Sequence, residues 1–198
     1  MKKVIPWVIP CLLMGSCGYQ YRFHSVDSSE VATVEIPYIQ GDSNALLHNA
    51  LAYELSCSGH FRPVLSGGDL LLKVSLLEDS QDRIGFRYDR DNPSGTRNKN
   101  LLAVEDRRVI RAKVSCIQAS SGAVLVDGYE VSSFADYDYT DPGSPQDLLF
   151  TAPSGGSESI IQFSLGQLDS YEGGHDAASS PVFKQLAQKI IEGLLSKE

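Results

Sequence analysis

The chain has 198 residues, of which 42% are hydrophobic and 21% are charged, a balance typical of a folded protein and not of a disordered one. Its formal net charge of -8 argues against general binding to nucleic acid. It also lacks an apolar run of the roughly 18 residues that a membrane-spanning helix needs. Its length fits one domain, or at most two small ones.

Residues 1–16 have the organisation of a secretory signal peptide. Two lysines give a positive start, a short apolar stretch follows, and small residues precede Cys17. The sequence Leu-Met-Gly-Ser-Cys resembles a bacterial lipobox, which implies cleavage before Cys17 and acylation of that residue. Gly18 stands where lipoproteins kept at the inner membrane often carry Asp, which favours the outer membrane. We therefore expect 17–30 to be a lipidated linker; an ordinary secreted protein cleaved nearby is the alternative.

A strand, a helix and a second strand are predicted first. Residues 31–36 are β-prone, and Asp42 or Ser43 can cap the helix that follows. The apolar face of this helix consists of leucines one turn apart: Leu47, Leu51 and Leu55. Gly59 suits the end of the helix. Residues 70–77 alternate in polarity and predict the second strand.

The next predicted elements are two strands and a long helix. The first strand alternates polar residues with an apolar series: Ile110, Ala112, Val114 and Cys116. A turn at 120–122 leads into a strand at 124–134, in which Gly128 marks a bulge. The helix is predicted to begin at Ser180-Pro181 and has the cleanest helical periodicity in the chain: Phe183, Leu186, Ala187, Ile190, Ile191, Leu194 and Leu195.

These elements predict a single α+β domain over 31–198. The order β-α-β-β-β-α suits a two-layer sandwich, in which two helices pack on one face of a small, mostly antiparallel sheet. Long loops are expected at 80–103 and 138–180, because both stretches are rich in polar residues, Gly and Pro.

No catalytic, cofactor or metal motif stands out. None of the four histidines lies at a ligand spacing from another His or Cys, and the pair His175-Asp176 is the only seed for an enzyme. Asp136-x-Asp138-x-Thr140 resembles part of a calcium loop but lacks its glycine, so a solvated acidic loop is favoured. The remaining cysteines, Cys57 and Cys116, are interpreted as small buried residues, although a disulfide between them is the alternative. We therefore expect a protein that is not an enzyme.

Positive charge is concentrated in one part of the sequence. Residues 83–113 hold nine of the 17 Lys and Arg residues, against four acidic residues. Arg107, Arg111 and Lys113 recur with the period of a strand and are expected to share one face. Arginine binds phosphate and carboxylate with two hydrogen bonds at once, so this face and the nearby Arg83 and Arg87 are candidate contacts for an anionic partner. The alternative is a solvated face that pairs with acidic residues of the same chain.

The order of several segments resembles the lipopolysaccharide-assembly lipoproteins of the LptE type. The lipobox is followed at once by an aromatic stretch, Gly18-Tyr19-Gln20-Tyr21-Arg22-Phe23, and then by a short strand that ends at Pro37. Three further segments match in order: the alternating strand at 69–74, the glycine turn at 120–125 and the terminal helix at 186–191. The match covers nearly the whole chain after Cys17.

The resemblance implies an outer-membrane role without covalent chemistry. Such lipoproteins assemble with and plug a large outer-membrane β-barrel, and they help to deliver lipopolysaccharide to the outer leaflet. It implies a protein anchored by acylated Cys17, on the periplasmic side or within the barrel lumen. The contacts to lipopolysaccharide or the barrel would then come from five cations: Arg83, Arg87, Arg107, Arg111 and Lys113. No cofactor and no nucleic acid is implied.

Two other functions fit the same sequence. One is a lipid-anchored interaction module of a different envelope machine, such as a pilotin or an activator of wall synthesis. The other is a surface-exposed lipoprotein without a barrel partner, in which residues 138–180 form an exposed loop.

Overall fold

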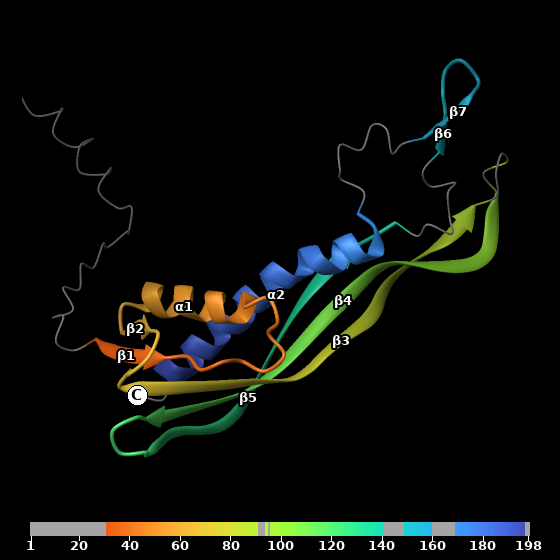
Figure 1. Cartoon of the computed structure of the whole chain (residues 1–198). Helices are drawn as coiled ribbons and strands as arrows, with labels where there is room; N and C mark the ends of the chain where they lie inside the picture. Colours follow the sequence, from red (N-terminus) through yellow and green to blue (C-terminus); the bar gives the residue numbers. More distant parts are fainter. Residues whose placement is uncertain (1–30, 91–93, 95, 141–148, 160–168, 197–198) are drawn as a thin grey trace, which may run out of the picture.

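Two helices cover one face of a long, twisted sheet (Figure 1). The structure is a computed structural model and describes residues 31–90, 94, 96–140, 149–159 and 169–196. In chain order its elements are β1 (Ala32–Glu35), α1 (Leu46–Ser58), β2 (Phe61–Val64), β3 (Leu70–Arg90), β4 (Arg97–Gln118), β5 (Val124–Asp138), β6 (Leu149–Thr151), β7 (Ser157–Ser159) and α2 (Tyr171–Leu195). The signal peptide and the linker at 17–30 lie outside the described residues.

The main sheet has five strands in the order β2-β1-β3-β4-β5. β3, β4 and β5 pair antiparallel, whereas β1 is parallel to both of its neighbours. The predicted α+β sandwich, with a mostly antiparallel sheet and both helices on one face, is confirmed. The sequence did not predict β2, because four residues that include Pro63 are too few to show alternation. Pro63 is tolerated because β2 is an edge strand.

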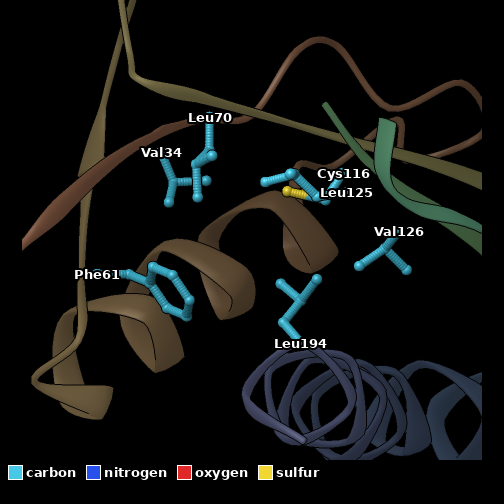
Figure 2. A pocket seen from close by; sticks show the side chains of 7 residues that line it. All are labelled: Val34, Phe61, Leu70, Cys116, Leu125, Val126 and Leu194. Carbon is cyan, nitrogen blue, oxygen red and sulfur yellow. The ribbon is translucent and has the colours of Figure 1, made fainter. Parts of the chain in front are cut away.

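The hydrophobic core lies between the helices and the part of the sheet that includes β1. The three leucines of α1 that share a face are fully buried, as predicted. So is the apolar series of β4, and α2 buries Leu186, Ala187 and Ile190. Each fully buried leucine or isoleucine contributes about 1.5–3 kcal/mol. Near the start of β1, apolar side chains from the strands and α2 surround a cavity (Figure 2).

The prediction of a loop at 80–103 was wrong for most of these residues, because they belong to β3 and β4. Beyond the last pairing of β4 with β5, at Glu105 and Asp138, β3 and β4 continue as a two-stranded ribbon (Figure 1). We call residues 84–90 and 97–104 the arm. In the described part of the chain, no helix packs on the arm. Ile84, Phe86 and Tyr88 alternate along β3 with polar residues or glycine, but residues 97–104 of β4 show no such alternation. Antiparallel backbone pairing, which side-chain patterning does not reveal, forms the ribbon.

The predicted boundaries of the segment 138–180 were also wrong. β6 and β7 pair as a small hairpin within it, and α2 begins at Tyr171, ten residues before Pro181. Ser170 caps the helix, since its Oγ accepts a hydrogen bond from the backbone N–H of Gly173 at 3.1 Å. Proline costs a helix one backbone hydrogen bond. The helix continues through Pro181 because residues on both sides of it, such as Ala178 and Val182, are buried, and this burial offsets the lost hydrogen bond.

The predicted turns are confirmed, with one change at the start of α1. Gly59 and Gly122 have the positive φ angles, 74° and 69°, that the end of a helix and a hairpin turn require. The pairing of β4 with β5 shifts register around Gly128, which has a φ of 52°, so the bulge is present. Asp42 caps α1 from a distance, because its Oδ2 accepts a hydrogen bond from the N–H of His48 at 2.9 Å.

Candidate functional site

The predicted cationic row lies on the face of the sheet that the helices leave uncovered, which we call the open face. On β4 the buried residues Arg108, Ile110 and Ala112 face the helices, so the alternate residues Arg107, Arg111 and Lys113 face the other way. The prediction that these three share a face is therefore confirmed. They extend over about 20 Å of strand.

Two of the three cations are paired with carboxylates of neighbouring strands. Arg107 donates two hydrogen bonds to Asp136, from Nε at 2.7 Å and from Nη2 at 2.8 Å. Arg111 Nε lies 3.0 Å from Glu78 Oε2. Hydrogen bonding from Arg107 lowers the pKa of Asp136, and the same hydrogen bonds raise the pKa of Arg107. The alternative prediction, that this face pairs with acidic residues of the chain, thus holds for Arg107 and Arg111.

These contacts also change the interpretation of the acidic motif. Asp136 and Asp138 belong to β5 and not to a loop, and Asp136 contacts the Arg107 guanidinium. Among the residues that the structure describes, no group of three or more His, Cys, Asp and Glu side chains is placed to hold a metal ion. The Nδ1 atom of His175 lies 3.7 Å from Asp176 Oδ1, and Asp176 is exposed on α2.

The other two predicted contact residues lie elsewhere. Arg83, opposite Asp106, is on the helix-facing side of the ribbon near the base of the arm. Arg87 lies within the arm, opposite Leu102. The five cations are therefore spread over both faces of the long hairpin, and no single surface carries them all.

The arm gathers arginines and exposed apolar side chains. Arg87, Tyr88, Arg90 and Arg97 line a hollow of about 460 Å³. The Arg97 guanidinium carbon lies 3.2 Å from the centroid of the Tyr88 ring, a cation–π contact that holds it over the tyrosine. Four large apolar side chains of the arm are exposed, namely Ile84, Phe86, Tyr88 and Leu101. Sequence reasoning counted Arg90 and Arg97 among the cations but did not select them, because the hairpin that brings them together was predicted as a loop.

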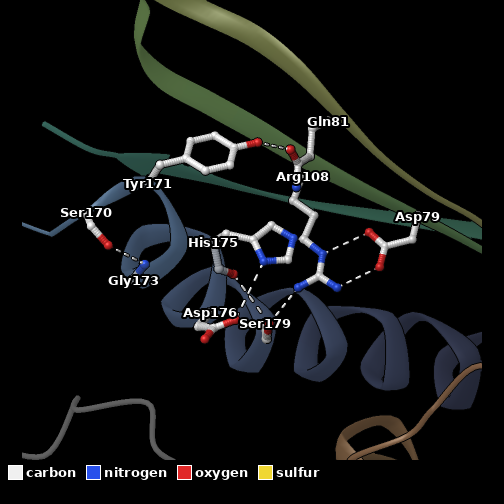
Figure 3. Close-up of polar contacts among 9 residues, drawn as sticks. All are labelled: Asp79, Gln81, Arg108, Ser170, Tyr171, Gly173, His175, Asp176 and Ser179. Carbon is white, nitrogen blue, oxygen red and sulfur yellow. Dashed lines mark hydrogen bonds and ion pairs between the residues drawn. The ribbon is translucent and has the colours of Figure 1, made fainter. Parts of the chain in front are cut away.

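A buried arginine at the base of the arm is the functional feature that sequence reasoning missed. Arg108 donates hydrogen bonds to both carboxylate oxygens of Asp79, at 2.9 and 2.6 Å, and a third to Ser179 of α2 (Figure 3). Its side chain is only 8% exposed, against 45% for Asp79. Hydrogen bonding to Asp79 raises the pKa of Arg108, so it stays charged. The doublet Arg107-Arg108 was the available clue, since consecutive residues of a strand point to opposite faces.

Aromatic residues surround this ion pair where α2 begins. The Tyr171 hydroxyl donates a hydrogen bond to the Gln81 side chain of β3 (Figure 3). The rings of Tyr137 and His175 meet edge to face, with centroids 6.1 Å apart. Tyr139 donates a hydrogen bond to the buried Asp106 at 3.1 Å. Burial raises the pKa of Tyr139 to about 12. Together with the Arg108–Ser179 hydrogen bond, these contacts attach the first turns of α2 to β3, β4 and β5.

Cys57 and Cys116 are both free thiols. Cys116 is buried in β4, as predicted, but Cys57 is exposed on α1, so the prediction of a buried residue was wrong there. In the described part of the chain, no helix combines the length and the apolar character needed to cross a membrane.

Comparison with known proteins finds similarity only at the level of solved structures. No protein-family model and no curated protein matches the chain. A Xanthomonas campestris protein of family DUF330 matches with a TM-score of 0.48 and 9% identity, over 84% of this chain and 85% of that one. A minor lipoprotein of Acinetobacter baumannii matches with a TM-score of 0.43 and 12% identity, over 80% of this chain and 87% of that one. Rare lipoprotein B of Shewanella oneidensis matches with a TM-score of 0.40 and 11% identity, over 83% of this chain and 94% of that one. Several similar structures are thus bacterial lipoproteins, but at these scores the likeness carries no argument about function.

Proposed function

We propose that this protein is an outer-membrane lipoprotein that assembles with a lipopolysaccharide-translocating β-barrel, occupies its lumen and helps to deliver lipopolysaccharide to the outer leaflet. The lipobox at Cys17 supplies the membrane anchor. The resemblance of the segment order to lipopolysaccharide-assembly lipoproteins supplies the partner class. The proposal places the protein on the periplasmic side of the membrane, with the arm entering the lumen.

The geometry of the arm is the observation that carries the proposal. A ribbon of two strands that extends beyond the helices has no use in the core, and its exposed Phe86, Tyr88 and Leu101 are the kind of residues that become buried at an interface. The lumen of an outer-membrane barrel is polar and can be plugged by protein. The arm offers both apolar and charged groups to such a wall.

The arginine-lined hollow of the arm is the proposed contact for lipid phosphate. One guanidinium group can donate two hydrogen bonds to the oxygens of one phosphate. Three arginines line the hollow together with Tyr88. We assign lipopolysaccharide contact first to Arg87, Arg90 and Arg97, because their guanidinium groups converge on one hollow, and the open face to contact with the barrel wall.

The first test is purification of the tagged protein from detergent-solubilised outer membranes, with mass spectrometry of what accompanies it. A large β-barrel at near-equal amount supports the proposal. Recovery of a secretion or wall-synthesis component instead would assign the protein to another envelope machine. If no such partner is recovered and protease added to intact cells cleaves the protein, a surface-exposed lipoprotein is favoured.

Photo-crosslinking tests the role of the arm itself. A photoreactive phenylalanine analogue at Phe86, which is 53% exposed, is expected to crosslink to the barrel. The same analogue at Leu65, which is 97% exposed between β2 and β3, is the control at the other end of the sheet. Equal crosslinking from both sites would contradict insertion of the arm.

Charge reversal tests the phosphate contact. Arg87→Glu combined with Arg97→Glu is expected to weaken lipopolysaccharide binding at least tenfold. Lys184→Glu makes the same kind of change on the exposed side of α2 and should leave binding unchanged. Unchanged binding in the arm variant would remove the phosphate contact and leave the barrel contact standing.

A further inference from the structure

An apolar cavity lies at the end of the core opposite the arm. It has a volume of about 190 Å³ and is lined by Val34 of β1, Phe61 of β2 and Leu70 of β3 on one side. Cys116 of β4, Val126 of β5 and Leu194 of α2 line the other side, and all of these side chains surround the same space (Figure 2). Among the residues that the structure describes, no charged residue takes part in the lining.

The cavity is partly open to solvent, yet it reaches between side chains of the core. Side chains in a core are packed as densely as organic crystals, and voids larger than a water molecule are few. The lining is mostly apolar and offers water few hydrogen-bond partners, whereas a well-held water makes two to four hydrogen bonds. An apolar cavity of about 150 Å³ is known to stay dry and to bind small apolar molecules. The cavity therefore suits an apolar ligand.

The surroundings of the cavity indicate how such a ligand would enter. Leu125 lines it and is still 54% exposed, so the cavity reaches the surface at the start of β5. Val124 beside it is 55% exposed. An opening with an apolar margin favours a long, flexible ligand that places one end in the cavity and leaves the rest outside.

The position of the cavity identifies the chemistry of that ligand. It lies against β1, whose first residue is joined to Cys17 by a linker of 14 residues that can span at most about 50 Å. We propose that the cavity binds the end of one lipid acyl chain. Two sources supply the same chemistry: the lipid attached at Cys17 and a lipid of the membrane in which it is anchored. The proposal goes beyond the proposed function and uses only the lipid anchor from it.

Binding of a fluorescent fatty acid, cis-parinaric acid, tests the proposal. The probe is titrated into the acylated protein and into the full chain carrying Cys17→Ser, which has no lipid. Saturable binding by the Cys17→Ser chain alone supports a cavity occupied by the protein's own acyl chain. Saturable binding by both supports a cavity open to membrane lipid. No saturable binding by either chain would overturn the proposal.

Two substitutions locate the binding. Val126→Phe fills the cavity and is expected to weaken binding of the probe to the Cys17→Ser chain at least tenfold. Leu101→Phe adds the same ring to an exposed residue of the arm, at the other end of the sheet, and should leave binding unchanged. Should Val126→Phe fail to fold, Cys116→Phe fills the cavity from β4 instead. Unchanged binding in a folded cavity-filling variant would overturn the site, whatever the outcome of the barrel purification.

Discussion

The two ends of the β3–β4 hairpin have the same backbone pairing but opposite surroundings. Near β1 the hairpin lies under α1 and α2, and its Leu72 and Val114 are buried. In the arm the same two strands meet water on both faces, and Phe86 and Leu101 are exposed. Stability therefore comes from the first end, because burial of apolar area is the main favourable term in folding. The second end is available for binding.

The neighbours Arg107 and Arg108 repeat this contrast within one dipeptide. Both donate two hydrogen bonds to an aspartate, but Arg107 does so on the open face and Arg108 under α2. Loss of the Arg108–Asp79 pair should destabilise the fold more than loss of the Arg107–Asp136 pair. A charge left without its partner is more destabilising when it is buried than when it is exposed to water.

The largest effect is expected from the core. Leu51→Ala should lower the free energy of unfolding by about 3 kcal/mol, because it leaves a cavity under α1. Leu101→Ala in the arm should change it by less than about 0.5 kcal/mol. Urea denaturation of both variants measures the difference. Similar losses would contradict the division into a stabilising end and a binding end.

The buried arginine should rank second. Arg108→Ala should cost about 2 kcal/mol, less than a fully buried pair would, because Asp79 is nearly half exposed. The matched control is Arg111→Ala on the same strand, which should cost less than about 1 kcal/mol. Thermal unfolding of the two variants gives the comparison, and equal shifts would show that burial does not separate these arginines.

Two neighbouring glycines of α2 should respond with opposite signs. A Cβ at Gly174 would lie 2.8 Å from Tyr137 Cδ2 and 3.0 Å from the backbone oxygen of Asp138, so Gly174→Ala should cost about 1–2 kcal/mol. A Cβ at Gly173 would have only ordinary contacts, so Gly173→Ala should raise stability by about 0.5 kcal/mol. Calorimetry of both variants checks the close docking of α2 on β5. A stabilising Gly174→Ala would exclude it.

The smallest effect is expected from pH on the open face. Arg107 lowers the pKa of Asp136, so their contact stabilises the fold above the ordinary pKa of an aspartate, and this stabilisation is lost as pH falls through the lowered pKa. Because the pair is exposed, Asp136→Asn should lower the melting temperature by about 1 °C at pH 6 and by less near pH 2.5. A pH-independent difference between the two proteins would rule out the ion pair as its cause.

The sequence by itself determined the lipobox, the apolar faces of the helices, the glycine turns and the shared face of Arg107, Arg111 and Lys113. Each of these depends on local chemistry or on a period of 2 or 3.6 residues imposed by burial on one side. Only the tertiary structure decided the arm, the early start of α2, the buried Arg108 and the cavity beside Cys116. In the arm only the β3 strand keeps a period of two, and backbone pairing with β4 leaves no mark on the side-chain pattern. A helix held by packing continues through Pro181. A buried charge or a void exists only once distant segments meet.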